Sequence, residues 1–149
     1  MSSVSAGQGA SIKIPDLNLS SSIVNFPLEA DTWAIDPWQK RVGFLEGTTW
    51  FQSPGNMVLA GHSVMPNGKA GIFAHIDQLQ VGAELIVSDG AEERHYTVSE
   101  VRVVNEYDVS VVYPTGDDRL TLITCEASSL DPASQTYSNR VVVVATRSG

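Results

Sequence analysis

Three side chains of this sequence could together attack a carbonyl group: Cys125, His62 and Arg140. Cys125 is the only cysteine in the chain. A cysteine thiolate is a strong nucleophile, and a histidine imidazole can donate or accept a proton near neutral pH. Arginine keeps its positive charge at neutral pH and can hold two oxygen atoms at once. These residue types suit nucleophilic catalysis, provided that the fold brings them together.

Predicted strands place the three side chains at one edge of a sheet. Residues 119–125 are β-branched or aliphatic at both alternating sets of positions, which predicts a central strand covered on both faces. A second apolar strand covers residues 57–60 and ends just before Gly61-His62, and a third covers residues 140–146. If the first two strands are parallel neighbours and the third is antiparallel to the first, the three side chains converge.

Each of these residues also has an ordinary structural interpretation. A lone buried cysteine is more often a small hydrophobic residue than a nucleophile, and an arginine at a strand end is usually a surface charge. The other two histidines fit catalysis less well: His95 is expected on a solvated face, and His75 is expected to pack or hydrogen-bond within a short helix. The histidines and Cys125 lack zinc-type spacing, so no metal site is predicted.

Length and composition limit the fold and the kind of partner. A chain of 149 residues predicts one domain with its own core. The formal charge of −8, without a basic patch, argues against nucleic-acid binding. No apolar run approaches the roughly 18 residues of a membrane span, and no signal-peptide pattern is present. Residues 1–10 are rich in Ser, Gly, Ala and Gln, which predicts a flexible linker before a catalytic domain at 11–149.

Alternating apolar patterns and turn residues predict an all-β fold. Strands are expected over residues 84–88 and 94–104, joined by a hairpin at Asp89-Gly90. A short edge strand is expected to begin at Ser11 and to stop at Pro15.

Helical signals are few. Asp36-Pro37 predicts the start of a short helix ending at Gly43. Residues 72–79 have the spacing of one or two helical turns, and 105–118 should be a loop with one turn near Val109. Together, the pattern predicts a closed barrel with one or two short helices.

Several segments resemble the sortases, the cysteine transpeptidases that attach proteins to Gram-positive-type cell walls. Thr121-Leu122-Ile123-Thr124-Cys125 matches the TLxTC signature of that family. Leu59-Ala60-Gly61-His62 resembles its histidine segment, and Asn139-Arg140-Val141-Val142-Val143 resembles its arginine strand. Ile12-Lys13-Ile14-Pro15 and Phe73-Ala74-His75-Ile76 also look like sortase segments. The resemblance extends from Ser11 to Thr146, with the motifs in the family's order, and it leaves the subclass open.

The resemblance implies an eight-stranded sortase-type barrel and a two-step acyl transfer. Cys125 would attack the Thr–Gly carbonyl of an LPxTG-like sorting signal, and His62 would serve as general acid and then as general base. Arg140 would hold the substrate backbone and the oxyanion, helped by Thr124. By their places in the motifs, Ala60, Ile123 and Thr124 would line the signal groove, with loop 105–118 as its wall.

The same resemblance suggests partners and a location. The substrates would be proteins with a C-terminal sorting signal, and the acceptor would be an amine of a cell-wall precursor or a pilin lysine. No cofactor is expected: some sortases bind calcium through an acidic cluster before the histidine strand, where this chain offers only Glu46. Sortases are normally membrane-anchored at the cell surface outside the cytoplasm, so an anchor absent from this chain is expected.

Two other functions fit the same residues. A cysteine peptidase would use the same groups but resolve the thioester with water, and a non-catalytic β-barrel adaptor would contain an inert Cys125. Alkylation with iodoacetamide at neutral pH would separate the adaptor from the enzymes.

Because both Cys125 and His62 end apolar strands, burial is expected to keep most of the thiol protonated and turnover slow at neutral pH.

Overall fold

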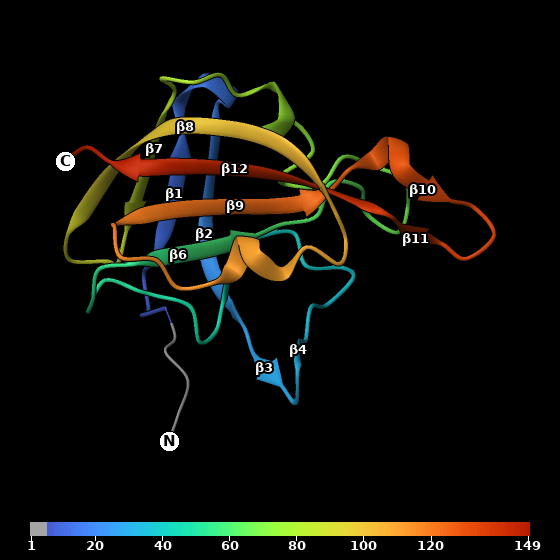
Figure 1. Cartoon of the computed structure of the whole chain (residues 1–149), viewed down its shortest axis with the longest axis horizontal. Helices are drawn as coiled ribbons and strands as arrows, with labels where there is room; N and C mark the ends of the chain where they lie inside the picture. Colours follow the sequence, from blue (N-terminus) through green and yellow to red (C-terminus); the bar gives the residue numbers. More distant parts are fainter. Residues whose placement is uncertain (1–5) are drawn as a thin grey trace.

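The fold is a closed barrel of eight strands, seen in a computed structural model that describes residues 6–149 (Figure 1). The strands follow one another around the barrel in the order β1-β2-β5-β6-β9-β12-β8-β7. They are β1 (Ser11–Ile14), β2 (Leu19–Phe26), β5 (Val42–Leu45), β6 (Asn56–Ala60), β7 (Glu84–Ser88), β8 (Glu93–Asn105), β9 (Arg119–Cys125) and β12 (Asn139–Arg147). The predicted all-β class and closed eight-stranded barrel are confirmed.

Short elements connect the barrel strands. Two small hairpins project from the barrel (Figure 1): β3 (Leu28–Glu29) with β4 (Thr32–Trp33), and β10 (Leu130–Asp131) with β11 (Thr136–Tyr137). Within residues 6–149 the helices are four short 3-10 helices, more than the one or two predicted: η1 (Pro15–Leu17), η2 (Ile76–Gln78), η3 (Val109–Val112) and η4 (Ala127–Ser129). No helix in this part of the chain is long and apolar enough to cross a membrane.

Strand β9 lies between β6 and β12, as its sequence predicts. It runs parallel to β6 and antiparallel to β12. Leu120 and Leu122 are fully buried in the main core, and Thr121, which points to the opposite face, is also buried. The Thr121 hydroxyl donates to the side-chain oxygen of buried Asn56 on β6, at 2.6 Å. Both faces of β9 are therefore covered.

A second, smaller apolar cluster covers the outer face of β5 and β6. Its buried members are Phe26, Leu45, Val58 and Ala60, and Val24, Trp33, Val112 and Ile123 pack against them. Loop 105–118 contributes Val112, and the side-chain amide of Asn56 donates to the Val111 and Tyr113 carbonyls in the same loop. This cluster gives the end of the barrel an apolar surface outside the main core.

The helix predicted from Asp36 to Gly43 is wrong. The Asp36 side chain accepts the Trp38 N–H at 2.9 Å, and the Asp36 carbonyl accepts the Gln39 N–H at 3.0 Å, so the capping signal makes a single turn. Val42 to Leu45 then form β5, in which all four residues are buried. Gly43 suits this strand because a Cβ there would lie 2.3 Å from the Phe26 ring. Pairing with β2 and β6 overrides the local helix signal.

The amino-terminal predictions also differ from the structure. Ala6 and Ala10, assigned to a linker, are buried against the core, and the Ala6 N–H donates to the Asn25 side chain at 2.7 Å. Residues 1–5 of the predicted linker lie outside the described residues. Strand β1 is not an edge strand, because it pairs with β2 on one side and β7 on the other. Barrel closure accounts for this difference, since it leaves no free edge.

Candidate active site

The three candidate catalytic residues converge because of the strand register. Ala60 at the end of β6 pairs with Ile123 in parallel β9, and His62 follows two residues later. Arg140 in antiparallel β12 pairs directly with Cys125. Figure 1 shows the carboxyl end of β9 meeting the start of β12 beside the β10–β11 hairpin. The predicted convergence of the three strand ends is confirmed.

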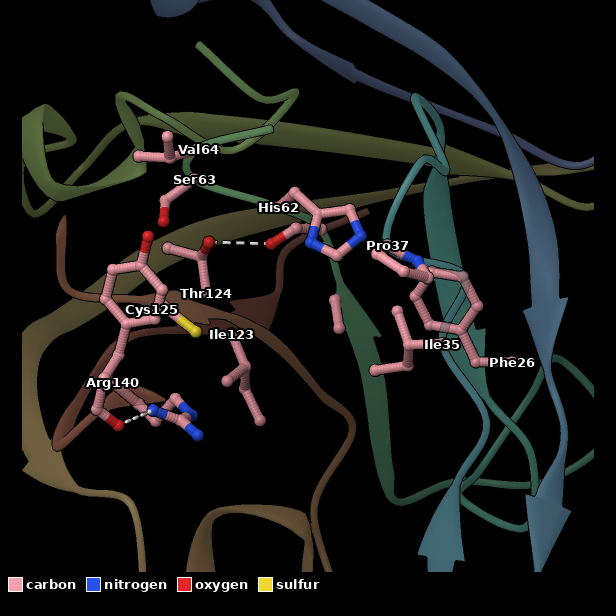
Figure 2. A pocket seen from close by; sticks show the side chains of 13 residues that line it. Phe26, Ile35, Pro37, His62, Ser63, Val64, Ile123, Thr124, Cys125 and Arg140 are labelled. Atoms are coloured by element: carbon pink, nitrogen blue, oxygen red, sulfur yellow. Dashed lines mark hydrogen bonds between the residues drawn. The ribbon is translucent and has the colours of Figure 1, made fainter. Parts of the chain in front are cut away.

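A cleft of about 300 Å³ opens at this end of the barrel (Figure 2). It contains all six residues that the sequence assigns to the site: His62, Cys125, Arg140, Ala60, Ile123 and Thr124. The other lining residues are Phe26, Ile35, Pro37, Gly61, Ser63, Val64 and Tyr137. No residue of loop 105–118 lines this cleft, which differs from the predicted wall; its Val112 packs in the outer apolar cluster instead.

Burial dominates the electrostatics of Cys125. The residue is partly buried, and loss of hydration raises the pKa of its thiol because the thiolate is disfavoured. The positive charge of Arg140 opposes this rise, and the negative charge of Glu106 adds to it. The thiol is therefore the main form at neutral pH, as the apolar strand end predicts.

Backbone carbonyls hold the Arg140 side chain at the cleft. Its Nη1 donates to the Tyr137 carbonyl at 2.8 Å and to the Asn139 carbonyl at 3.1 Å. Its Nη2 lies 3.8 Å from a carboxylate oxygen of Glu106, and both side chains are about 30% exposed. One edge of the guanidinium is thus fixed by the chain, while Nε makes no hydrogen bond to any residue in 6–149.

The imidazole of His62 is held by the turn that follows Ile35. Its Nε2 lies 2.9 Å from the Asp36 carbonyl oxygen, which can only accept a hydrogen bond. Nε2 therefore carries the proton in neutral His62, and Nδ1 is the nitrogen that can accept one. Figure 2 shows His62 beside Pro37, with Cys125 and Arg140 on the other side of the cleft.

The backbone around His62 is fixed on both sides. The Gly61 N–H donates to the Ile123 carbonyl at 3.2 Å, and the Thr124 hydroxyl donates to the Gly61 carbonyl at 2.7 Å (Figure 2). The hydroxyl of Thr124 therefore ties β9 to the histidine segment, whereas the resemblance implies that Thr124 helps to hold the oxyanion. The His62 carbonyl accepts the Phe73 N–H at 3.0 Å.

The other histidines lie outside this cleft. His95 forms ion pairs with Glu84 at 2.8 Å and Glu93 at 3.3 Å on the β7–β8 hairpin, in keeping with its predicted solvated face. His75 is exposed, and its Nδ1 lies 3.4 Å from the side-chain nitrogen of Gln78, so it is hydrogen-bonded rather than packed. Within residues 6–149, no three His, Cys, Asp or Glu side chains gather to hold a metal ion.

Sequence reasoning missed several residues of the site. Ile35 and Pro37 line the cleft, whereas the sequence predicts a helix start at Asp36-Pro37. Tyr137 lines it from β11, and Glu106, next to the end of β8, approaches Arg140. The proximity of Tyr137 to the arginine in sequence was a usable signal. The sequence gives no comparable signal for Glu106, because this residue approaches Arg140 only through the pairing of β8 with β12.

Comparison with known proteins follows the same motifs. Residues 12–148 match the family described as Sortase domain. Sortase A of Listeria monocytogenes is 36% identical over 72 residues, which are 48% of this chain and 32% of that protein. Sortase A of Bacillus anthracis is 37% identical over 71 residues, which are 48% of this chain and 33% of that protein. These two matches thus span about a third of each relative.

A solved structure extends the similarity to nearly the whole chain. Sortase C1 from Streptococcus agalactiae superposes with a TM-score of 0.76 at 25% identity, covering 96% of this chain and 68% of that chain. The family match over residues 12–148 includes every residue of the cleft and the three converging strand ends. On this basis the chain belongs to the sortase family of cysteine transpeptidases.

Proposed function

We propose that this chain cleaves an LPxTG-like sorting signal between Thr and Gly and transfers the acyl group to an amine. The observation that carries the proposal is the register pair Cys125–Arg140 in one cleft with His62. A nucleophile, a proton carrier and a fixed positive charge are the groups that acyl transfer requires.

In the first step, the Cys125 thiol gives its proton to Nδ1 of His62. The thiolate attacks the threonine carbonyl carbon, and the carbonyl electrons move to oxygen, beside the Arg140 guanidinium. When this intermediate collapses, the carbon–nitrogen bond breaks and the glycine nitrogen takes the proton from His62. A thioester on Cys125 and a free amine remain.

In the second step, an incoming amine attacks the thioester and gives a proton to His62. The carbon–sulfur bond breaks, the new amide is released, and the Cys125 sulfur recovers its proton. Because the thiol pKa is raised, the reactive thiolate–imidazolium pair is a minority form, which predicts slow turnover. Ala60 and Ile123 offer the apolar surface on which the sorting signal would lie.

The proposed partners follow from this chemistry. The donor would be a protein with a C-terminal sorting signal, and the acceptor an amine of a cell-wall precursor or a pilin lysine. The full-length protein would be anchored in the membrane at the cell surface, outside the cytoplasm. No metal or other cofactor enters the proposed steps.

Mass spectrometry after incubation with a panel of sorting-signal peptides and amines tests the proposal. We expect a covalent acyl-enzyme on the parent and a transfer product that depends on the amine. Cys125→Ala should form neither while keeping its fold, with a packing cost of about 1 kcal/mol for loss of one sulfur. Turnover in Cys125→Ala would overturn the assignment. A hydrolysis product unaffected by any amine would instead identify a cysteine peptidase.

A further inference from the structure

A second cleft, of about 410 Å³, lies near the backbone segment that carries His62. Trp38 lines this cleft, whereas its neighbour Pro37 lines the first. Gly71 also lines it, and a Cβ at Gly71 would lie 2.1 Å from the His62 carbonyl oxygen. The second cleft therefore adjoins the first at its histidine side.

Unpaired positive charges gather at this cleft, although the protein is acidic overall. Lys40 and Lys69 both line it, and they are two of only three lysines in a chain of formal charge −8. Neither forms an ion pair with a carboxylate in residues 6–149, and no acidic residue of this part of the chain lines the cleft. Four of the arginines, by contrast, are paired with carboxylates.

The cleft also has apolar lining residues. Trp38 is 55% exposed, although tryptophan is normally well buried. Met65 and Ile72 line the same cleft. A ligand that combines a negative charge with an aliphatic or flat apolar part would match both features, since the ammonium groups attract the charge and the indole covers the rest.

We propose that this second cleft binds an anionic group of the acceptor substrate while the acceptor's amine enters the first cleft. The inference rests on the proposed function, in which the incoming amine must give its proton to His62. The remainder of the acceptor then extends outward on the histidine side, where Lys40 and Lys69 lie. The enzyme would thereby favour amines attached to carboxylate-bearing groups over neutral ones.

Two matched acceptors test this preference. Triglycyl-glutamyl-glutamate amide and triglycyl-glutaminyl-glutamine amide have nearly the same size and differ in charge. With each, the ratio of transfer product to hydrolysis product is measured at low salt. We expect the acidic acceptor to be favoured by about 3- to 10-fold, the scale of two exposed ion pairs, and the preference to shrink as salt is added.

Substitution of the lysines locates the effect. The double variant Lys40→Gln/Lys69→Gln should lose the preference, with acylation by a neutral donor peptide unchanged. Lys13→Gln is the matched control, because Lys13 is an exposed lysine on β1 that lines neither cleft. Equal use of both acceptors, or a preference that survives in the double variant, would overturn the inference.

A preference for the neutral acceptor over the acidic one would overturn it as well. That result would direct attention to another cleft beside Cys125, which is bordered by Asp77 and Glu126. Absence of any acyl-enzyme would refute the proposed function instead. In that case, peptide binding to the second cleft tests the inference independently. Fluorescence of exposed Trp38 should change on titration with the acidic peptide, less with the neutral one, and not in Trp38→Phe. The same response to both peptides would refute an anion site.

Discussion

Arg140 and Cys125 are register partners across the antiparallel β9–β12 pair. Directly opposed residues in such a pair project their side chains from the same face. The positive charge next to the thiol is therefore placed by two central barrel strands. By contrast, the His62 ring is held by a loop carbonyl, that of Asp36. Strand pairing thus positions the charge of Arg140, whereas a loop positions the imidazole of His62.

Replacement of Arg140 by lysine should reduce turnover strongly. Lysine keeps the charge but lacks the planar guanidinium. In Arg140, one guanidinium nitrogen contacts the Tyr137 and Asn139 carbonyls, which leaves the other two nitrogens available. We expect release of the leaving amine from a sorting-signal peptide to fall by roughly 10² or more, the scale for loss of one oxyanion donor. Arg102→Lys, at an exposed position of β8, is the control and should keep the parental rate. A near-parental rate for Arg140→Lys would show that Arg140 contributes only its positive charge.

The rate of Cys125 alkylation should increase only at a higher pH than for an ordinary cysteine. Burial raises the thiol pKa, so the inflection should lie above that of an ordinary cysteine. Glu106→Gln should move the inflection down because the nearby negative charge is removed, and Arg140→Gln should move it up. Iodoacetamide rates measured from pH 6 upward report this directly. An inflection well below neutral pH would mean a preformed thiolate and contradict the prediction.

Gly71→Ala should damage both stability and activity. A Cβ at position 71 would lie 2.1 Å from the His62 carbonyl oxygen, a distance that the backbone must relieve by moving. We expect a loss of about 1–3 kcal/mol in the free energy of unfolding, the scale for overpacking, and slower acylation because His62 shifts. Gly116→Ala serves as control, since nothing lies within 4 Å of its added Cβ. Denaturant unfolding and acylation rates are measured on both; equal behaviour would show that the His62 segment adapts freely.

His95 should make stability depend on pH near neutrality. The hydrogen bond to Glu84 is the largest cause that raises the pKa of His95, and Glu93 contributes in the same direction. The protonated form is thus favoured in the folded state. This stabilisation is fully present below the pKa of the unfolded histidine and is lost as pH rises through the raised folded value. In Glu84→Gln, the NMR titration of His95 should move to lower pH, while Glu92→Gln leaves it in place; no shift in Glu84→Gln would refute the pairing.

Local sequence patterns are enough to predict the barrel class, the central strand β9 and the residues that meet at its end. Alternation and β-branched runs are local properties, and they set strands wherever burial agrees with them. The bounds of β7 and β9 match the prediction residue for residue. The motif around Cys125 likewise depends only on the order of residues in the chain, and so do the positions of His62 and Arg140.

The surroundings of those residues depend instead on long-range packing. The segment from Asp36 to Gly43 carries a valid helix signal, yet pairing with β2 and β6 outweighs it and makes β5. The turn that remains brings the Asp36 carbonyl to His62, which no local pattern predicts. Glu106 reaches Arg140, and Trp38 and Lys69 line the same cleft, although the residues of each pair are distant in sequence. Such contacts depend on the register and packing of the whole barrel, which local sequence does not encode.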